Sequence, residues 1–138
     1  MRVFLDTNVL VYLFDADAPD KQEQARALLQ AEVANGRAVL STQVLQEFYV
    51  AVTRKLARPL DALTAEAALR CLAELPFTPV DSALVLRAAQ RSRTDDLSFW
   101  DSLIVETAVQ SGAKVLYSED LQHGRVVEGM QIVNPFQA

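Results

Sequence analysis

Short apolar runs alternate along the chain with longer segments in which apolar residues recur every three or four positions. The runs predict strands, and we expect these at residues 2–5, 38–40, 77–80, 114–117 and 131–133. The longer segments predict helices, and we expect these at residues 9–14, 21–34, 42–54, 64–75, 82–93 and 99–111. Short strands alternating with helices are typical of a parallel sheet with helices on both faces. We therefore predict one α/β domain over residues 1–138, with three layers (α/β/α) and a central, mostly parallel sheet of four to five short strands.

Polar residues at the expected helix starts support this division. Asp20 and Glu23 have the spacing of a capping box ahead of the helix at 21–34. Thr64 stands at the expected start of the helix at 64–75. Asp81 and Ser98 stand immediately before the helices at 82–93 and 99–111 as N-caps.

Four acidic residues stand at positions that are unusual for surface acids. Asp6 follows the first strand and Asp120 lies just beyond the strand at 114–117, so both fall at the carboxyl edge of the sheet, where ligands bind in such folds. Asp101 has apolar residues three, four and seven positions later, so its carboxylate projects from an apolar helix face. Glu47 lies at the border of the apolar face of its helix. Carboxylates are rarely buried unless they are paired or bind a metal.

Each of these acids also has an ordinary structural interpretation. Asp6 could be a turn residue or the N-cap of the next helix, and Asp101 could form a capping box with Ser98. Glu47 could be a border glutamate, and Asp120 could be a loop acid. The evidence for a site therefore comes from the set rather than from any one member.

The net charge of −5 counts weakly against a nucleic-acid partner, because phosphate binders usually carry a basic face. Divalent cations would remove this objection, since they convert an acidic pocket into one that attracts phosphate.

Cysteine content and hydropathy indicate whether the chain forms disulfides, is secreted or enters a membrane. The single cysteine, Cys71, excludes an intramolecular disulfide, and its Leu/Ala-rich surroundings predict a small buried residue. Asp6 and Asn8 interrupt the apolar start where a secretory signal should be unbroken. No apolar run is long enough to cross a bilayer. We therefore expect a cytoplasmic protein with no membrane segment.

The same residues fall in four motifs that together resemble the PIN-domain family over nearly the whole chain. The motifs are VFLDTNVLVYL, STQVLQEFY, LSFWDSLIVETA and VLYSEDLQHG. The resemblance implies Mg²⁺ or Mn²⁺ held by Asp6, Glu47, Asp101 and Asp120, with Asn8, Ser118 and Thr7 in support. It also favours Asp120 over its neighbour Glu119 as the last acid of the site.

The resemblance further implies a PIN-like fold and a VapC-like toxin of a type II toxin–antitoxin system. Such a protein would be an endoribonuclease that forms a homodimer, binds an antitoxin protein and cuts RNA. In that chemistry a divalent cation lowers the pKa of a bound water and neutralises charge on phosphate oxygens. We expect Asp6 and Asp101 to bind the principal ion directly. Glu47 and Asp120 would act through waters or hold a second ion.

Other interpretations fit the chain less well. A phosphatase of the haloacid-dehalogenase type needs a second Asp where this chain has Asn8, and a receiver domain needs an acidic pair that is not evident. A PIN-like scaffold that has lost activity and only binds RNA or protein partners remains the alternative.

Several residues near the motifs have an ordinary interpretation as well. Trp100 could be a base-stacking platform and His123 a base or phosphate contact, but we expect Trp100 to belong to the core and His123 to be an exposed loop residue. The basic groups at residues 54–58 and 87–93 are more typical of solvated helix faces than of RNA contacts.

Overall fold

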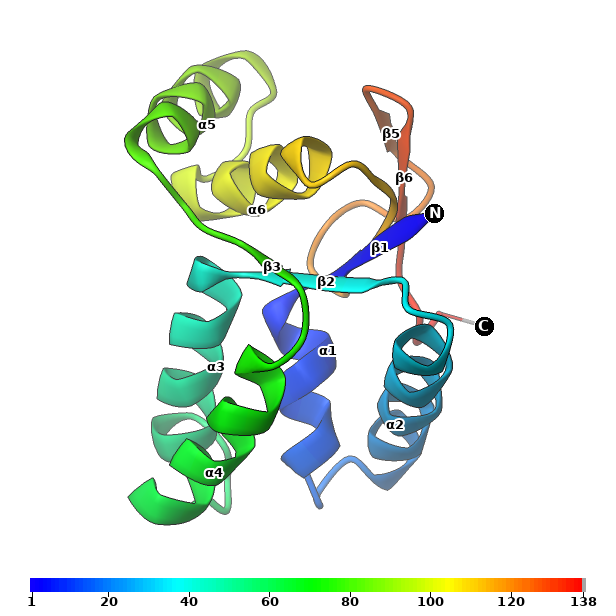
Figure 1. Ribbon diagram of the computed structural model, residues 1–138, viewed down its shortest axis with the longest axis vertical. Coiled ribbons are helices and arrows are strands. Elements are labelled where there is room, and N and C mark those ends of the chain that lie inside the picture. Colours follow the sequence, from blue (N-terminus) through cyan, green and yellow to red (C-terminus); the bar gives the residue numbers. More distant parts are fainter. Residues whose placement is uncertain (138) are drawn as a thin grey trace.

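The computed structural model describes residues 1–137 and has a three-layer architecture (Figure 1). The strands are β1 (Arg2–Leu5), β2 (Ala38–Ser41), β3 (Phe77–Thr78), β4 (Ala113–Tyr117), β5 (Val126–Val127) and β6 (Met130–Val133). The helices are α1 (Thr7–Val11), η1 (a 3₁₀ turn, Tyr12–Phe14), α2 (Pro19–Ala34), α3 (Thr42–Arg54), α4 (Ala62–Ala73), α5 (Ser82–Thr94) and α6 (Phe99–Gln110).

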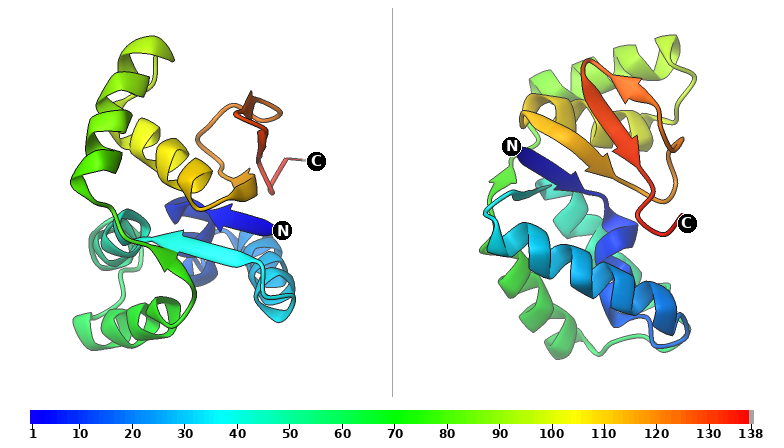
Figure 2. Two further views of the ribbon diagram at one scale, coloured as in Figure 1. Left: turned by 45° about the horizontal axis from the view of Figure 1, so that its top comes forward. Right: turned by 90° about the vertical axis from the view of Figure 1, so that its right-hand side faces the viewer.

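The strands form one sheet in the order β3-β2-β1-β4-β6-β5. All neighbours pair in parallel except β5, which pairs antiparallel with β6. Helices α1 to α4 cover one face and α5 with α6 the other, as the views in Figure 1 and Figure 2 agree. The expected three-layer fold with a mostly parallel sheet is therefore confirmed, although the sheet has six strands rather than four to five.

The extra strand is β5, which forms a short hairpin with β6. Its turn places Glu128 and Gly129 at positive φ (49° and 84°), a conformation that glycine adopts without steric cost. A two-residue strand is too short to give a periodic signal, so the sequence pattern did not reveal it.

The core lies between the sheet and the inner faces of its helices. Phe4 and Leu5 of β1 are completely buried, as is Phe48 of α3. From the opposite layer, Ile104 and Val105 of α6 join the same cluster. Because central parallel strands are covered on both faces, their residues form a continuous apolar run instead of alternating with polar ones.

Side-chain caps start several helices, but not always where the sequence pattern placed them. Ser98 accepts a hydrogen bond at the start of α6, and Asp81 does so for α5, as expected. The expected capping box of Asp20 is absent, because α2 begins at Pro19 without a side-chain cap. Helix α4 begins at Ala62 rather than at Thr64, since the carboxylate of the preceding Asp61 accepts from the Thr64 N–H.

The structure also bears on the expected burial of Cys71 and on the expected lack of a membrane segment. Cys71 is exposed, so the expectation of a buried cysteine was wrong: the Leu/Ala-rich helix turns that side chain outward. No helix within residues 1–137 combines the length and apolar character that a membrane span requires.

Candidate active site

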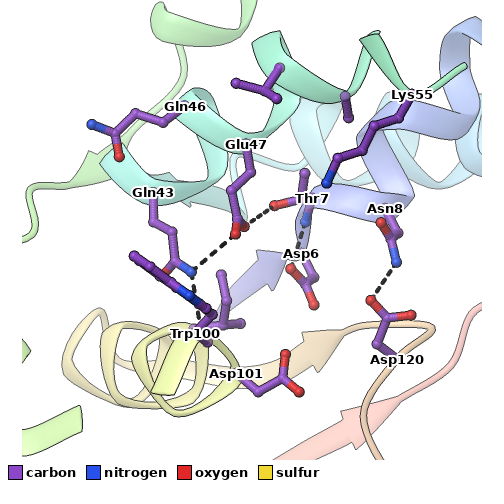
Figure 3. A pocket seen from close by; sticks show the side chains of 13 residues that line it. Asp6, Thr7, Asn8, Gln43, Gln46, Glu47, Lys55, Trp100, Asp101 and Asp120 are labelled. Atoms are coloured by element: carbon purple, nitrogen blue, oxygen red, sulfur yellow. Dashed lines mark hydrogen bonds between the residues drawn. The ribbon is translucent and has the colours of Figure 1, made fainter. Parts of the chain in front are cut away.

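All four candidate acids line one pocket at the carboxyl edge of the sheet (Figure 3). The pocket has a volume of about 570 Å³. Asp6 follows β1 directly, and Asp120 lies in the loop after β4. Glu47 comes from α3, which starts where β2 ends, and Asp101 comes from the first turn of α6. The crossing of the chain between parallel strands thus brings together residues more than a hundred positions apart.

Asp6 is the most enclosed of these acids, with only 6% of its surface exposed. It is the N-cap residue of α1, and its Oδ1 accepts a hydrogen bond of 2.7 Å from the Thr7 N–H. Its Oδ2 accepts a bond of 2.8 Å from the Ser118 hydroxyl. The capping interpretation is therefore correct but incomplete, because the same carboxylate also faces the pocket.

Burial raises the pKa of Asp6 from 3.8 to about 6, even though the hydrogen bonds from Ser118 and Thr7 oppose the change. The negative charges of Asp120 and Glu47 raise it further. An ionised Asp6 is thus unfavourable in this pocket as long as no cation balances it.

Glu47 is half-buried and held by neighbouring polar side chains. The Thr7 hydroxyl donates to its Oε1 at 2.9 Å, and the Gln43 amide approaches its Oε2 at 3.5 Å. Gln43 Nε2 also donates to the backbone carbonyl of Trp100 at 3.1 Å. Through these contacts, α3 is tied both to the start of α1 and to the start of α6.

Adjacent acids after β4 point in different directions. The Asn8 amide donates to the carboxylate of Asp120, which lines the pocket. Glu119 instead accepts hydrogen bonds from the Tyr12 hydroxyl at 2.7 Å and from the Lys21 ammonium. Asp120, and not Glu119, is therefore the acid that this loop presents to the pocket.

These surroundings give the two acids opposite pKa changes. Burial raises the pKa of Asp120, and the charges of Asp101 and Glu119 add to the effect. Burial also opposes ionisation of Glu119, but the bonds from Lys21 and Tyr12 outweigh it and hold the pKa of Glu119 below its ordinary value.

Asp101 forms half of a capping box. Its backbone N–H donates to the Ser98 hydroxyl oxygen at 3.0 Å. Within residues 1–137, its carboxylate has neither a hydrogen-bond partner nor an ion pair, and it lines the pocket. The capping interpretation therefore explains the backbone of Asp101 and leaves its side chain available.

The donor set suits a hard divalent cation, because oxygen atoms of carboxylates are its preferred ligands. None of the four acids forms an ion pair with a basic side chain of the described residues, so their charge is uncompensated. As the side chains lie, however, no three acids, histidines or cysteines of residues 1–137 converge on a common metal position. Mg²⁺ keeps several waters and needs few direct protein ligands, so a site for it does not require three converging acids.

Seven residues that line the pocket lie outside the predicted set, and two of them are aromatic or basic; the seven are Gln43, Gln46, Val50, Ala51, Lys55, Trp100 and Ile104. Trp100, expected in the core, is 62% exposed, so that expectation was wrong. The large apolar ring suggested a core position, but Trp100 lies in the first turn of α6 and lines the pocket. Lys55, at the end of α3, is the other.

His123 and the arginines of α5 that the sequence offered as candidates lie outside the pocket. His123 is exposed in a loop, as expected, and its Nδ1 accepts from the Asn134 N–H at 2.9 Å. Arg87 and Arg91 do not line the pocket; both approach Glu106 on the face of α6 that meets α5.

Comparison with known proteins identifies the family. A family model of the PIN domain matches residues 3–129. The chain belongs to the PIN-domain family. No curated protein is significantly similar to this PIN domain in sequence.

Several solved structures share the fold of this PIN domain. The VapC20 toxin of Mycobacterium tuberculosis, which cleaves the sarcin–ricin loop, is 22% identical, with a TM-score of 0.69 over 86% of this chain and 89% of that one. A toxin–antitoxin complex from Klebsiella pneumoniae is 17% identical, with a TM-score of 0.71 over the full length of both chains. VapBC2 from Rickettsia felis, bound to promoter DNA, is 17% identical, with a TM-score of 0.66 over 96% and 97%. At these identities the likeness concerns the fold.

Proposed function

We propose that this PIN domain is a metal-dependent endoribonuclease that hydrolyses RNA phosphodiester bonds at the pocket lined by Asp6, Glu47, Asp101 and Asp120. The observation that carries the proposal is the gathering of four uncompensated carboxylates in one pocket, with one of them almost fully buried. A protein gains nothing in stability from such an arrangement unless a cation offsets the repulsion.

Mg²⁺ or Mn²⁺ is the cation that we assign to this pocket, with Asp6 and Asp101 as its direct ligands. When bound, such an ion supplies an activated water and neutralises charge that develops on the phosphate oxygens. Asp6 is suited to a fixed role, because Thr7 and Ser118 hold both of its oxygens. Asp101 is suited to a role that changes during the reaction, because its carboxylate is free to accept hydrogen bonds in the pocket.

The remaining pocket residues orient these groups. Glu47, positioned by Thr7, and Asp120, positioned by Asn8, would bind waters of the ion or a second ion. Thr7, Asn8 and Ser118 donate hydrogen bonds to carboxylates and so fix their geometry. Because these hydrogen-bond donors already hold the carboxylates in place, few side chains have to move when the substrate binds.

We also propose that the protein is the toxin of a toxin–antitoxin pair, acts in the cytoplasm, forms a homodimer and binds an antitoxin protein. The support is the shared fold with a toxin that cleaves the sarcin–ricin loop and with two toxin–antitoxin complexes, one of them bound to DNA. Co-expression with the product of the adjacent reading frame tests this part. Growth arrest by this chain alone, relieved by the neighbour, is the expected result, and unimpaired growth would contradict it.

Cleavage of a mixed RNA pool tests the activity. Wild type and Asp101→Asn would each be incubated with Mg²⁺, with Mn²⁺ and with EDTA. We expect cutting by wild type alone, abolished by EDTA. No cutting under any condition would favour a silent scaffold, and equal cutting by both proteins would refute the site assignment.

A further inference from the structure

Trp100 is the only tryptophan of the chain, and its indole lies in solvent beside the carboxylates. Its ring meets that of Phe99 edge to face, with centroids 5.1 Å apart, yet 62% of the Trp100 surface remains exposed. Single exposed apolar side chains are common and need no explanation by themselves. The position of this one is what matters, because Trp100 precedes Asp101 and lines the same pocket.

The backbone of Trp100 is held by a buried polar side chain. Gln43 is only 3% exposed, and its amide donates to the Trp100 carbonyl while it also approaches Glu47. The same amide therefore links the backbone of Trp100 to one of the pocket acids. Figure 3 shows Trp100 and Gln43 together at one side of the pocket.

Lys55 supplies the pocket with its only basic side chain among the described residues. Most cationic side chains of residues 1–137 are engaged by acids, including Lys21, Arg37 and Arg91. Lys55 has no such partner within that range. In Figure 3 the Lys55 ammonium and the Trp100 ring lie on either side of Glu47.

We propose that Trp100 is the stacking platform for a nucleobase next to the scissile phosphate, and that Lys55 contacts a phosphate of the same strand. This inference rests on the proposed ribonuclease function and assigns the substrate contacts of that pocket. An aromatic face and a cation that flank the reactive groups are the means by which proteins hold single strands. The base on Trp100 must be unpaired, since both faces of a base within a helix are already stacked.

The pocket is also large enough for this role. Its volume of about 570 Å³ lies within the range of sites for small organic ligands and exceeds the needs of a hydrated ion. Val50 and Ile104 add apolar lining to the pocket that contains the indole and the carboxylates. A base stacked on the Trp100 ring lies in the same pocket as the carboxylates, so its adjoining phosphate is near them.

Fluorescence tests the stacking directly, because every tryptophan signal of this protein comes from Trp100. Short single-stranded RNA oligonucleotides would be titrated into Asp101→Asn protein with Mg²⁺, so that the RNA stays intact. An abasic ribose-phosphate oligomer of the same length is the control. We expect saturable quenching by RNA and little change with the abasic oligomer. Equal responses to both, or none to either, would overturn the proposal.

Kinetics supply the second measurement. Trp100→Leu should raise KM for RNA roughly 5- to 150-fold, as loss of one base–aromatic stack predicts, with a smaller effect on kcat. Trp100→Phe, which keeps an aromatic ring, should recover much of the loss. Phe77→Leu, which changes another exposed aromatic residue outside the pocket, should leave KM unchanged. Unchanged KM in Trp100→Leu would refute the proposal.

These outcomes separate this inference from the proposed function. If wild type cuts RNA but Trp100→Leu behaves like it and no quenching occurs, only the stacking role fails. If wild type cuts no RNA, the ribonuclease proposal fails, and the titration still decides whether Trp100 binds bases. Fluorescence that changes with protein concentration in the absence of RNA would instead identify Trp100 as a contact between copies of the chain.

Discussion

Replacement of the buried Asp6 by Asn should make the metal-free protein more stable at neutral pH. Asn keeps the shape of Asp and can preserve both local hydrogen bonds. Its Oδ1 can accept from the Thr7 N–H, and its amide can donate to the Ser118 hydroxyl oxygen. What the substitution removes is a negative charge in a nearly closed site among other acids.

The size of the effect follows from the pKa of Asp6, which burial raises from 3.8 to about 6. Each pKa unit corresponds to about 1.4 kcal/mol, so ionised Asp6 costs the folded state about 3 kcal/mol. The folded state binds this proton more tightly than the unfolded state does. Stability therefore falls as pH rises from about 4 to about 6 and stays low above that range.

Urea denaturation in EDTA at about pH 7.5 and about pH 3.5 measures this difference. We expect Asp6→Asn to exceed wild type in unfolding free energy by up to about 3 kcal/mol at the higher pH, and the gap to close at the lower. Added Mg²⁺ should stabilise wild type more than the variant.

Asp61→Asn is the matched control, because it removes the same charge from an exposed cap whose pKa is lowered by its hydrogen bonds to Thr64. That variant should show no gain at the higher pH. A variant Asp6→Asn that is less stable than wild type in EDTA at about pH 7.5 would refute the reasoning.

Further substitutions test the arrangement around the pocket. Ser118→Ala removes a hydrogen bond to Asp6 and should lower RNA cleavage about 10- to 100-fold with the fold intact by circular dichroism, whereas unchanged cleavage would argue against a positioning role. Asp120→Asn should abolish RNA cleavage, whereas Glu119→Gln, which lies outside the pocket, should retain most of it. Loss of cleavage in Glu119→Gln together with its retention in Asp120→Asn would make Glu119 the acid of the site. Phe48→Ala, in the core, should cost about 3–5 kcal/mol in urea denaturation, and a loss below about 1 kcal/mol would contradict the packing described.

Much of the fold could be predicted from the sequence, because the spacing of apolar residues along the chain reflects which side chains the fold buries. The strand that carries Phe4 and Leu5 is apolar throughout, as central parallel strands are, and Asp81 and Ser98 cap the helices they precede. The starts of α2 and α4 were misplaced because several residues there compete for the same role. Pro19 fixes the first turn ahead of Asp20, and Asp61 rather than Thr64 is the capping residue.

The gathering of the four acids in one pocket could be predicted for a different reason. Asp6 and Asp120 follow strands, and the topology of a parallel sheet brings strand ends to one edge. The exposure of Trp100 and the lack of an acidic partner for Lys55 could not be predicted in this way, because both are properties of the folded surface. Local pattern also could not show that Tyr12 and Lys21 engage Glu119, since these residues are far from it in sequence.

The central claim is that the acid pocket binds a divalent cation for RNA cleavage, and anomalous scattering from crystals grown with Mn²⁺ tests it most directly. The claim requires a Mn²⁺ peak inside the pocket within coordination distance of Asp6 or Asp101, and its loss in Asp6→Asn crystals of unchanged fold. A pocket without Mn²⁺ at saturating concentration, or Mn²⁺ bound only elsewhere on the molecule, would contradict it.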